Sequence, residues 1–215
     1  MPPTITDAIA VQAAEHLAYH DAVLRPIIER VGPATFRPHR DYYWELVDAI
    51  ISQQLSVSAA RSIEQRFQAL FGSQVPTPEQ ILEQDIDSLR RVGLSRPKAT
   101  YIHDLAHHIV DGRLSFADFD QLSNDAIRSQ LIDVKGIGEW TIHMFLMFCL
   151  GRLDVLPVGD LGIRNSMRQL YGFTALPTPD DIRAIAQKHT WHPYESIASW
   201  YVWQNLDNLG TTPAL

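Results

Sequence analysis

Apolar residues recur at helical spacing along almost the whole of this 215-residue chain. In the segment DYYWELVDAIISQQLS, which starts at Asp41, one helical face would carry Leu46, Val47, Ile50, Ile51 and Leu55. No stretch alternates apolar and polar residues for long enough to predict a sheet. The pattern therefore predicts an all-α fold of roughly ten short helices joined by short turns.

Capping residues mark where these helices begin and end. The segments PTPEQIL and PTPDDIR repeat one start signal, in which Thr77 or Thr178 is the N-cap and a proline takes the first helical position. Ser56 is the predicted N-cap of a helix that ends just before Gly72. Residues 191–206 are predicted to form the last helix.

The composition excludes several classes of protein. Cys149 is the only cysteine, so the chain forms no internal disulfide, iron–sulfur cluster or cysteine-based zinc site. The N-terminal residues lack the basic and apolar regions of a signal peptide. No apolar run approaches the roughly 20 residues that span a bilayer. We therefore expect a cytoplasmic protein that makes no membrane contact.

The net charge of −7 argues against a general affinity for nucleic acid, because backbone binding usually relies on an excess of lysine and arginine. A DNA-binding chain of this charge needs a local surface. Backbone N–H groups and helix N-termini contribute to such a surface without appearing in a charge count.

The segment IDVKGIGEWTIHMF interrupts the helical pattern. Residues 123–134 and 139–150 are predicted helices, and Lys135, Gly136 and Gly138 lie between them. Glycine tolerates a positive φ and allows another backbone to approach closely. The second helix begins with unpaired N–H groups, and Thr141 adds a hydroxyl, which together suit a phosphate. The alternative interpretation is a tight turn between two helices.

Five segments together carry a family resemblance: VKGIGEWTIHMF, LPVGDLGIR, AIISQQLSVSAA, GLSRPKATYI and WHPYESIASWYVW. In these segments the chain resembles the helix-hairpin-helix DNA glycosylase superfamily, most closely its 3-methyladenine DNA glycosylase II branch, over roughly residues 15–208. The resemblance implies two packed helical lobes with the active-site cleft between them. One lobe spans 42–152, with the hairpin at about 123–150, and the other combines 1–41 with 153–215. We expect no N-terminal β domain of the kind that some members carry.

The resemblance assigns the essential aspartate of the family to Asp160. Asp160 is also the predicted N-cap of the segment DLGIRNSMRQLYG, and helix N–H groups favour a charged capping carboxylate. Cleavage of a base–sugar bond passes through an oxocarbenium-like sugar, which a nearby anion stabilises. An alkylated purine that carries positive charge leaves as a neutral base. Whether Asp160 also orients the attacking water stays open.

Aromatic residues are expected to line the pocket for an extruded base. The resemblance places Trp140 and Trp203 there, although both also fit a helical core. Met144 replaces an aromatic residue of the best-known relative, and Tyr43 and Trp44 are candidate border residues. Relatives that also cut the strand carry a lysine at the position of Trp140. Because tryptophan is no amine nucleophile, we expect a monofunctional enzyme.

DNA contacts follow from the same resemblance. Leu55 matches the residue that fills the gap left by the extruded base, and it is flanked by Gln53 and Gln54. The further expected DNA contacts are Lys135, Gly136, Gly138, Thr141, Arg96, Lys98 and Arg164. The alternative for Leu55 is the end of an apolar stripe, and a surface lysine or arginine is often merely solvated.

The resemblance also implies a structural Na⁺ or K⁺ held by the backbone carbonyls of Ile132, Val134 and Ile137, and no other cofactor. Together with the resemblance, the sequence leads us to expect a monomeric DNA glycosylase that removes alkylated bases such as 3-methyladenine and 7-methylguanine from damaged double-stranded DNA in base excision repair. It would be associated with the nucleoid in a bacterial cell. The alternatives are a non-catalytic helix-hairpin-helix DNA-binding protein and a helical interaction scaffold.

Overall fold

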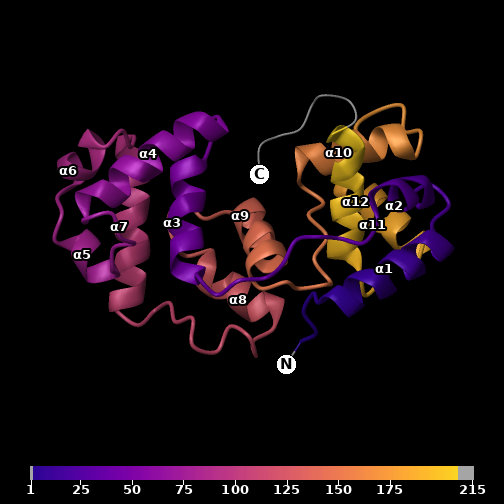
Figure 1. Ribbon diagram of the computed structural model, residues 1–215, viewed down its shortest axis with the longest axis horizontal. Helices are drawn as coiled ribbons and strands as arrows, with labels where there is room; N and C mark the ends of the chain where they lie inside the picture. The colour runs from indigo at the N-terminus through magenta and orange to yellow at the C-terminus, as the bar shows by residue number, and fades with distance from the viewer. Residues whose placement is uncertain (1, 208–215) are drawn as a thin grey trace. The chain divides into compact units, whose positions relative to one another are not determined.

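The computed structural model describes residues 2–207, and this part of the chain is helical (Figure 1). It contains twelve α-helices, and its one β feature is an isolated bridge between Thr4 and Arg152. The predicted all-α class is therefore confirmed. None of the described helices is long and apolar enough to cross a membrane. The last residues of the predicted second lobe, 208–215, lie outside the described part.

The described chain divides into two compact units, and Arg40–Phe145 form the first of them. Its central helix is α7 (Arg96–Val110), which packs against three of the other six helices, α3, α5 and α6. The other six are α3 (Tyr42–Ser52), α4 (Val57–Leu70), α5 (Pro78–Leu82), α6 (Ile86–Arg91), α8 (Asn124–Leu131) and α9 (Glu139–Met144).

The second unit combines Pro3–His39 with residues 146–207. Its helices are α1 (Asp7–His20), α2 (Arg25–Val31), α10 (Leu161–Leu170), α11 (Pro179–Lys188) and α12 (Glu195–Asp207). Helix α12 packs against α1, α2 and α10 (Figure 1). It is buried on nearly every side, which explains why its sequence shows no polar stripe.

The capping signals act as the sequence predicts. The side chain of Ser56 accepts a hydrogen bond from the N–H of Ala59 at the start of α4. Thr77 and Thr178 each form a capping box with the third residue of their helix. Each box satisfies two backbone N–H groups that would otherwise lack a partner. These local signals therefore set the starts of α4, α5 and α11.

Several predicted helix boundaries are wrong. Helix α8 ends at Leu131 and not at residue 134, because the Val134 N–H donates to the Leu131 carbonyl in a turn. Helix α3 ends at Ser52, so Leu55 lies in the turn that follows it and not on the helical face.

The last helix begins at Glu195 and not at residue 191, because Trp191 and Tyr194 belong to a preceding turn in which the Tyr194 N–H donates to the Trp191 carbonyl at 2.6 Å. The second helix of the hairpin is α-helical only to Met144 and continues as a π-helical turn, Phe145–Cys149.

Asp21 is fully buried and joins three parts of the second unit. Its carboxylate accepts hydrogen bonds from the Tyr171 hydroxyl at 2.6 Å and from the Trp191 indole N–H at 2.9 Å. It also accepts the backbone N–H groups of Val23 and Leu24, which begin the turn into α2. A buried charge is tolerated when hydrogen bonds surround it, and here they connect α1, α10 and the turn before α12.

We predict that Asp21→Ala lowers the free energy of unfolding by about 3 kcal/mol or more, because it leaves the buried donors of Tyr171 and Trp191 unpaired. Urea unfolding monitored by circular dichroism measures this change. The control is Asp180→Ala, whose side chain is 92% exposed, and its effect should stay within about 0.5 kcal/mol. Equal stability of the two variants would contradict the role of Asp21.

Candidate active site

Asp160 is held by hydrogen bonds from two helices. Its Oδ1 accepts the N–H of Ile163 at 2.7 Å, as the N-cap of α10, and the indole N–H of Trp203 at 3.0 Å. Trp203 lies on α12, which packs against α10. The structure thus brings together two of the predicted site residues, and it gives Trp203 a polar role that the pocket-wall prediction did not include.

Gly162 makes this close approach possible. A Cβ at residue 162 would lie 3.0 Å from Asp160 Oδ1 and 3.2 Å from Trp203 Nε1. A side chain at this position would therefore require the carboxylate or the indole to shift by a few tenths of an ångström. Sequence reasoning missed Gly162, although a glycine in the first turn of a helix is itself a signal, since it costs helix stability relative to alanine.

The two hairpin glycines have different roles. Gly136 has a φ of +85°, and a side chain there would collide with the ring of Tyr101 on α7. Gly138 has open space around it and precedes α9. Arg128 of α8 and Glu139 of α9 form an ion pair that closes the hairpin. Gly136 thus serves internal packing, and the open approach predicted for a foreign backbone exists at Gly138.

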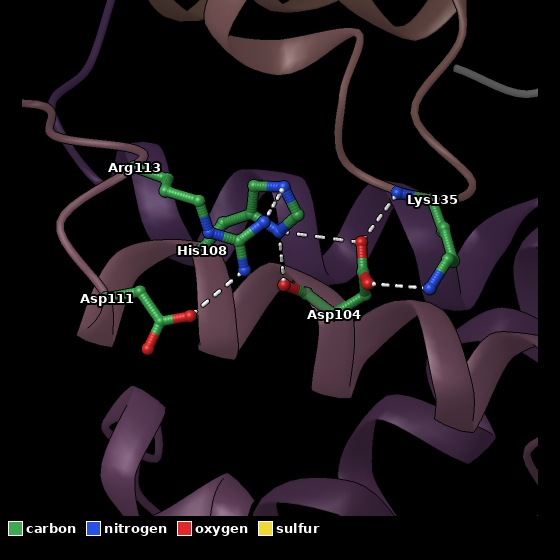
Figure 2. Close-up of polar contacts among 5 residues, drawn as sticks. All are labelled: Asp104, His108, Asp111, Arg113 and Lys135. Atoms are coloured by element: carbon green, nitrogen blue, oxygen red, sulfur yellow. Dashed lines mark hydrogen bonds and ion pairs between the residues drawn. The ribbon is translucent and has the colours of Figure 1, made fainter.

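Lys135 is bound to Asp104 through both its main chain and its side chain (Figure 2). Its N–H donates to Oδ2 at 2.9 Å, and its Nζ lies 3.1 Å from Oδ1. Partial burial acts to raise the pKa of Asp104, but the hydrogen bonds and charge of Lys135 outweigh it and lower that pKa. The ammonium predicted to contact phosphate therefore forms an ion pair with Asp104 of α7, and the Lys135 side chain is 66% exposed.

The turn after α3 carries Leu55, which is 37% exposed. Lys98 fixes this turn by donating to the carbonyls of Ile51 at 2.7 Å and Gln53 at 2.6 Å. Burial lowers the pKa of Lys98. The Gln53 amide donates to the Gly136 carbonyl at 2.8 Å, which ties the turn to the hairpin, and Gln54 adopts a φ of +57°. Lys98 thus caps the C-terminus of α3.

A cavity of about 280 Å³ brings Leu55 and Trp140 together within the first unit. Asp48 on α3 also lines it, and burial, followed by the charges of Glu64 and Glu45, raises the pKa of Asp48 to about 6. Sequence reasoning missed Asp48, although a carboxylate in the apolar run LVDAII is a visible signal. Three predicted pocket residues of this unit do not line the cavity: Tyr43, Trp44 and Met144.

These three residues and the remaining predicted DNA-contact residues each have their own local surroundings. The Tyr43 hydroxyl is buried without a hydrogen-bond partner, and the Trp44 ring lies 6.3 Å from that of Phe67. Arg96 pairs with Asp87 at 3.1 Å, and Arg164 donates to the Pro177 carbonyl at 2.9 Å. Thr141 is buried, and Met144 is half-buried at the end of α9.

Residues 47–191 match the family described as the HhH-GPD superfamily of base excision DNA repair proteins. This range includes the turn of Leu55, the hairpin and Asp160. The chain belongs to this superfamily.

Similar proteins extend the superfamily match over most of the chain. The alkylbase DNA glycosidase-like protein mag2 of Schizosaccharomyces pombe is 32% identical over 90% of this chain and 92% of its own length. A crystal structure of a DNA-3-methyladenine glycosidase from Bacillus halodurans has a TM-score of 0.82, with 33% identity over 92% of this chain and 90% of that one. The 3-methyladenine DNA glycosylase Mag1 of S. pombe, in complex with abasic DNA, has a TM-score of 0.79 and 32% identity, and the match covers 94% of this chain and all (100%) of that one.

We predict that Lys98→Met destabilises this HhH-GPD protein by about 1–2 kcal/mol, because two carbonyls at the end of α3 lose a charged donor. Urea unfolding measures the loss of stability. In hydrogen-exchange experiments, the backbone amide of Leu55 should exchange faster than in the wild-type protein. Lys188→Met is the matched control, since Lys188 is exposed in the last turn of α11. If both variants behave alike, Lys98 does not fix the turn.

Proposed function

We propose that this protein is a DNA glycosylase that hydrolyses the bond between deoxyribose and an alkylated base, such as 3-methyladenine or 7-methylguanine. The observation that carries this proposal is the carboxylate of Asp160, which Ile163 and Trp203 hold in one position. The relatives named as 3-methyladenine glycosylases support the substrate class.

The chemistry requires a negative charge that does not move during the reaction. The departing base leaves a sugar with oxocarbenium character, and a fixed carboxylate stabilises that charge without reorganising. Asp160 accepts two hydrogen bonds on one oxygen, so its orientation is set before the substrate arrives. An alkylated base that carries positive charge departs as a neutral molecule and needs little help from an acid.

The proposed product is an abasic site without strand cleavage. A lyase step through a Schiff base needs an amine nucleophile, and Trp140 stands where the resemblance to bifunctional relatives would require a lysine. Lys135 is the lysine nearest to Trp140 in the sequence, and its ammonium forms an ion pair with Asp104. This arrangement favours a monofunctional enzyme.

The proposed DNA contacts are the open side of the hairpin at Gly138 and the exposed Leu55, which would fill the space left by an extruded base. Mag1, which is similar over almost the whole chain, is bound to abasic DNA. A structural Na⁺ or K⁺ on the carbonyls of Ile132, Val134 and Ile137 remains part of the proposal. Val134 already accepts the Ile137 N–H at 3.1 Å, which leaves one lone pair for a cation.

We predict that Asp160→Asn lowers the single-turnover rate of base release from methylated DNA by about 100-fold or more. Asparagine keeps the capping ability and removes the charge, so the melting temperature should change little. An unchanged rate would remove Asp160 from the chemistry. If the wild-type protein and the variant both bind DNA and neither releases a base, the protein is a non-catalytic DNA-binding protein.

We predict that Trp203→Phe lowers the single-turnover rate by about tenfold, because the carboxylate of Asp160 loses one of its two positioning hydrogen bonds. The dissociation constant for DNA should stay within about twofold, since phenylalanine keeps an aromatic ring at this position. The matched control is Trp200→Phe on the same helix, which should keep the wild-type rate. If weaker DNA binding by Trp203→Phe accounts for the slower release, Trp203 forms part of the pocket wall and does not position Asp160.

A further inference from the structure

The cavity beside Leu55 concentrates exposed apolar side chains on the first unit. Leu55, Val57 and Trp140 are 37%, 56% and 50% exposed, and all three line it. Exposed apolar groups gathered in a concave site indicate that something covers them. A volume of about 280 Å³ suits one planar ring system better than a whole nucleotide.

The polar lining of the same cavity is mainly acidic. Asp48 of α3 and Glu64 of α4 face it, and Arg61 is the one basic residue among its lining residues. Glu45, one turn before Asp48 on α3, adds a further negative charge that acts on Asp48. Asp48 and Ser52 are four residues apart on α3 and share one face of that helix, and both line the cavity together with Leu55 of the following turn.

A negative charge beside a DNA-binding residue is unfavourable unless it meets a positive group. The phosphates of DNA would be repelled, and the unmodified bases are neutral. The part of an alkylated strand that carries positive charge is the damaged base itself. The exposed indole face of Trp140 and the carboxylate of Asp48 both attract a planar cation.

We propose that Asp48 makes this glycosylase selective for positively charged bases, with the cavity of Leu55 and Trp140 as the place where the base is recognised. This inference rests on the proposed function. A cationic base gains from the charge of Asp48, whereas a neutral base of similar size gains only from the apolar walls. Asp48 is therefore a specificity-determining residue that adds to the stacking by Trp140.

The test compares two duplexes that differ only in one base, the cationic 7-methylguanine or the neutral hypoxanthine. We expect Asp48→Asn to lower the single-turnover release of 7-methylguanine by about tenfold and to leave the release of hypoxanthine unchanged. The ratio of the two rates cancels effects on folding, on Asp160 and on general DNA affinity. Glu83→Gln is the matched control, because it removes one exposed negative charge at the end of α5 and should leave the ratio unchanged.

The pH dependence of the same ratio provides a second test. The pKa of Asp48 is raised to about 6, with Glu45 on its own helix, Glu64 and Arg61 on α4 as the charged groups that face it. As the pH falls through about 6, Asp48 becomes protonated and the preference of the wild-type protein for the cationic base should decline. The ratio should be flat in Asp48→Asn. In Glu64→Gln the midpoint should move to lower pH, because one cause of the raised pKa is removed.

An unchanged ratio in Asp48→Asn would overturn the proposal, whether both rates stay the same or both fall equally. If the wild-type protein releases neither base, the proposed function fails, and the cavity is then tested by direct binding. In that case, the cationic nucleoside 1-methyladenosine should shift the Trp140 indole N–H signal in NMR spectra more than adenosine does, and Asp48→Asn should abolish the difference. Equal shifts by both nucleosides in the wild-type protein would exclude Asp48 as a counter-charge.

Discussion

The position of the Asp160 carboxylate depends on a hydrogen bond that comes from another helix. The cap to Ile163 alone would leave the side chain held by α10 only, and the indole of Trp203 adds a second point of attachment from α12. Gly162 leaves room for this arrangement, because a Cβ there would be closer to both partners than ordinary van der Waals contact. The packing of α12 on α10 therefore determines where the negative charge lies, and the proposed catalytic geometry rests on the core of the second unit.

Several cations that a sequence would assign to DNA are engaged within the protein. Lys98 binds two carbonyls at the end of α3, Lys135 binds Asp104, and Arg164 binds the carbonyl of Pro177. The bonds of Lys98 hold the turn that carries Leu55. In a chain with a net charge of −7, such bonds support the proposal that backbone N–H groups contribute to phosphate binding. The hairpin turn at Gly138, which leaves open space before α9, is suited to this role.

The sequence predicted those features that depend on local chemistry. Ser56, Thr77 and Thr178 cap helices as expected, since a cap requires only residues three positions apart. The sequence could not predict which of many possible acceptors Lys98 or Lys135 selects, because Ile51 and Asp104 are 47 and 31 residues away from them. The need for Gly162 likewise arises only once α12 brings Trp203 against α10. Tertiary contacts of this kind leave no periodic signal in the chain.

Selectivity for a damaged base is a difference between two affinities, and the walls of a pocket contribute to it unequally. Stacking on an indole is available to every base, because every base has a flat face, so Trp140 also holds normal bases, although its indole face favours a cation. A carboxylate acts differently: it repels every phosphate to the same extent and attracts only a base that carries positive charge. Asp48 therefore lowers the affinity for all DNA while it raises the relative affinity for a cationic lesion. An acidic group beside Leu55 and Trp140 is consistent with an enzyme that must leave most of the DNA it meets untouched.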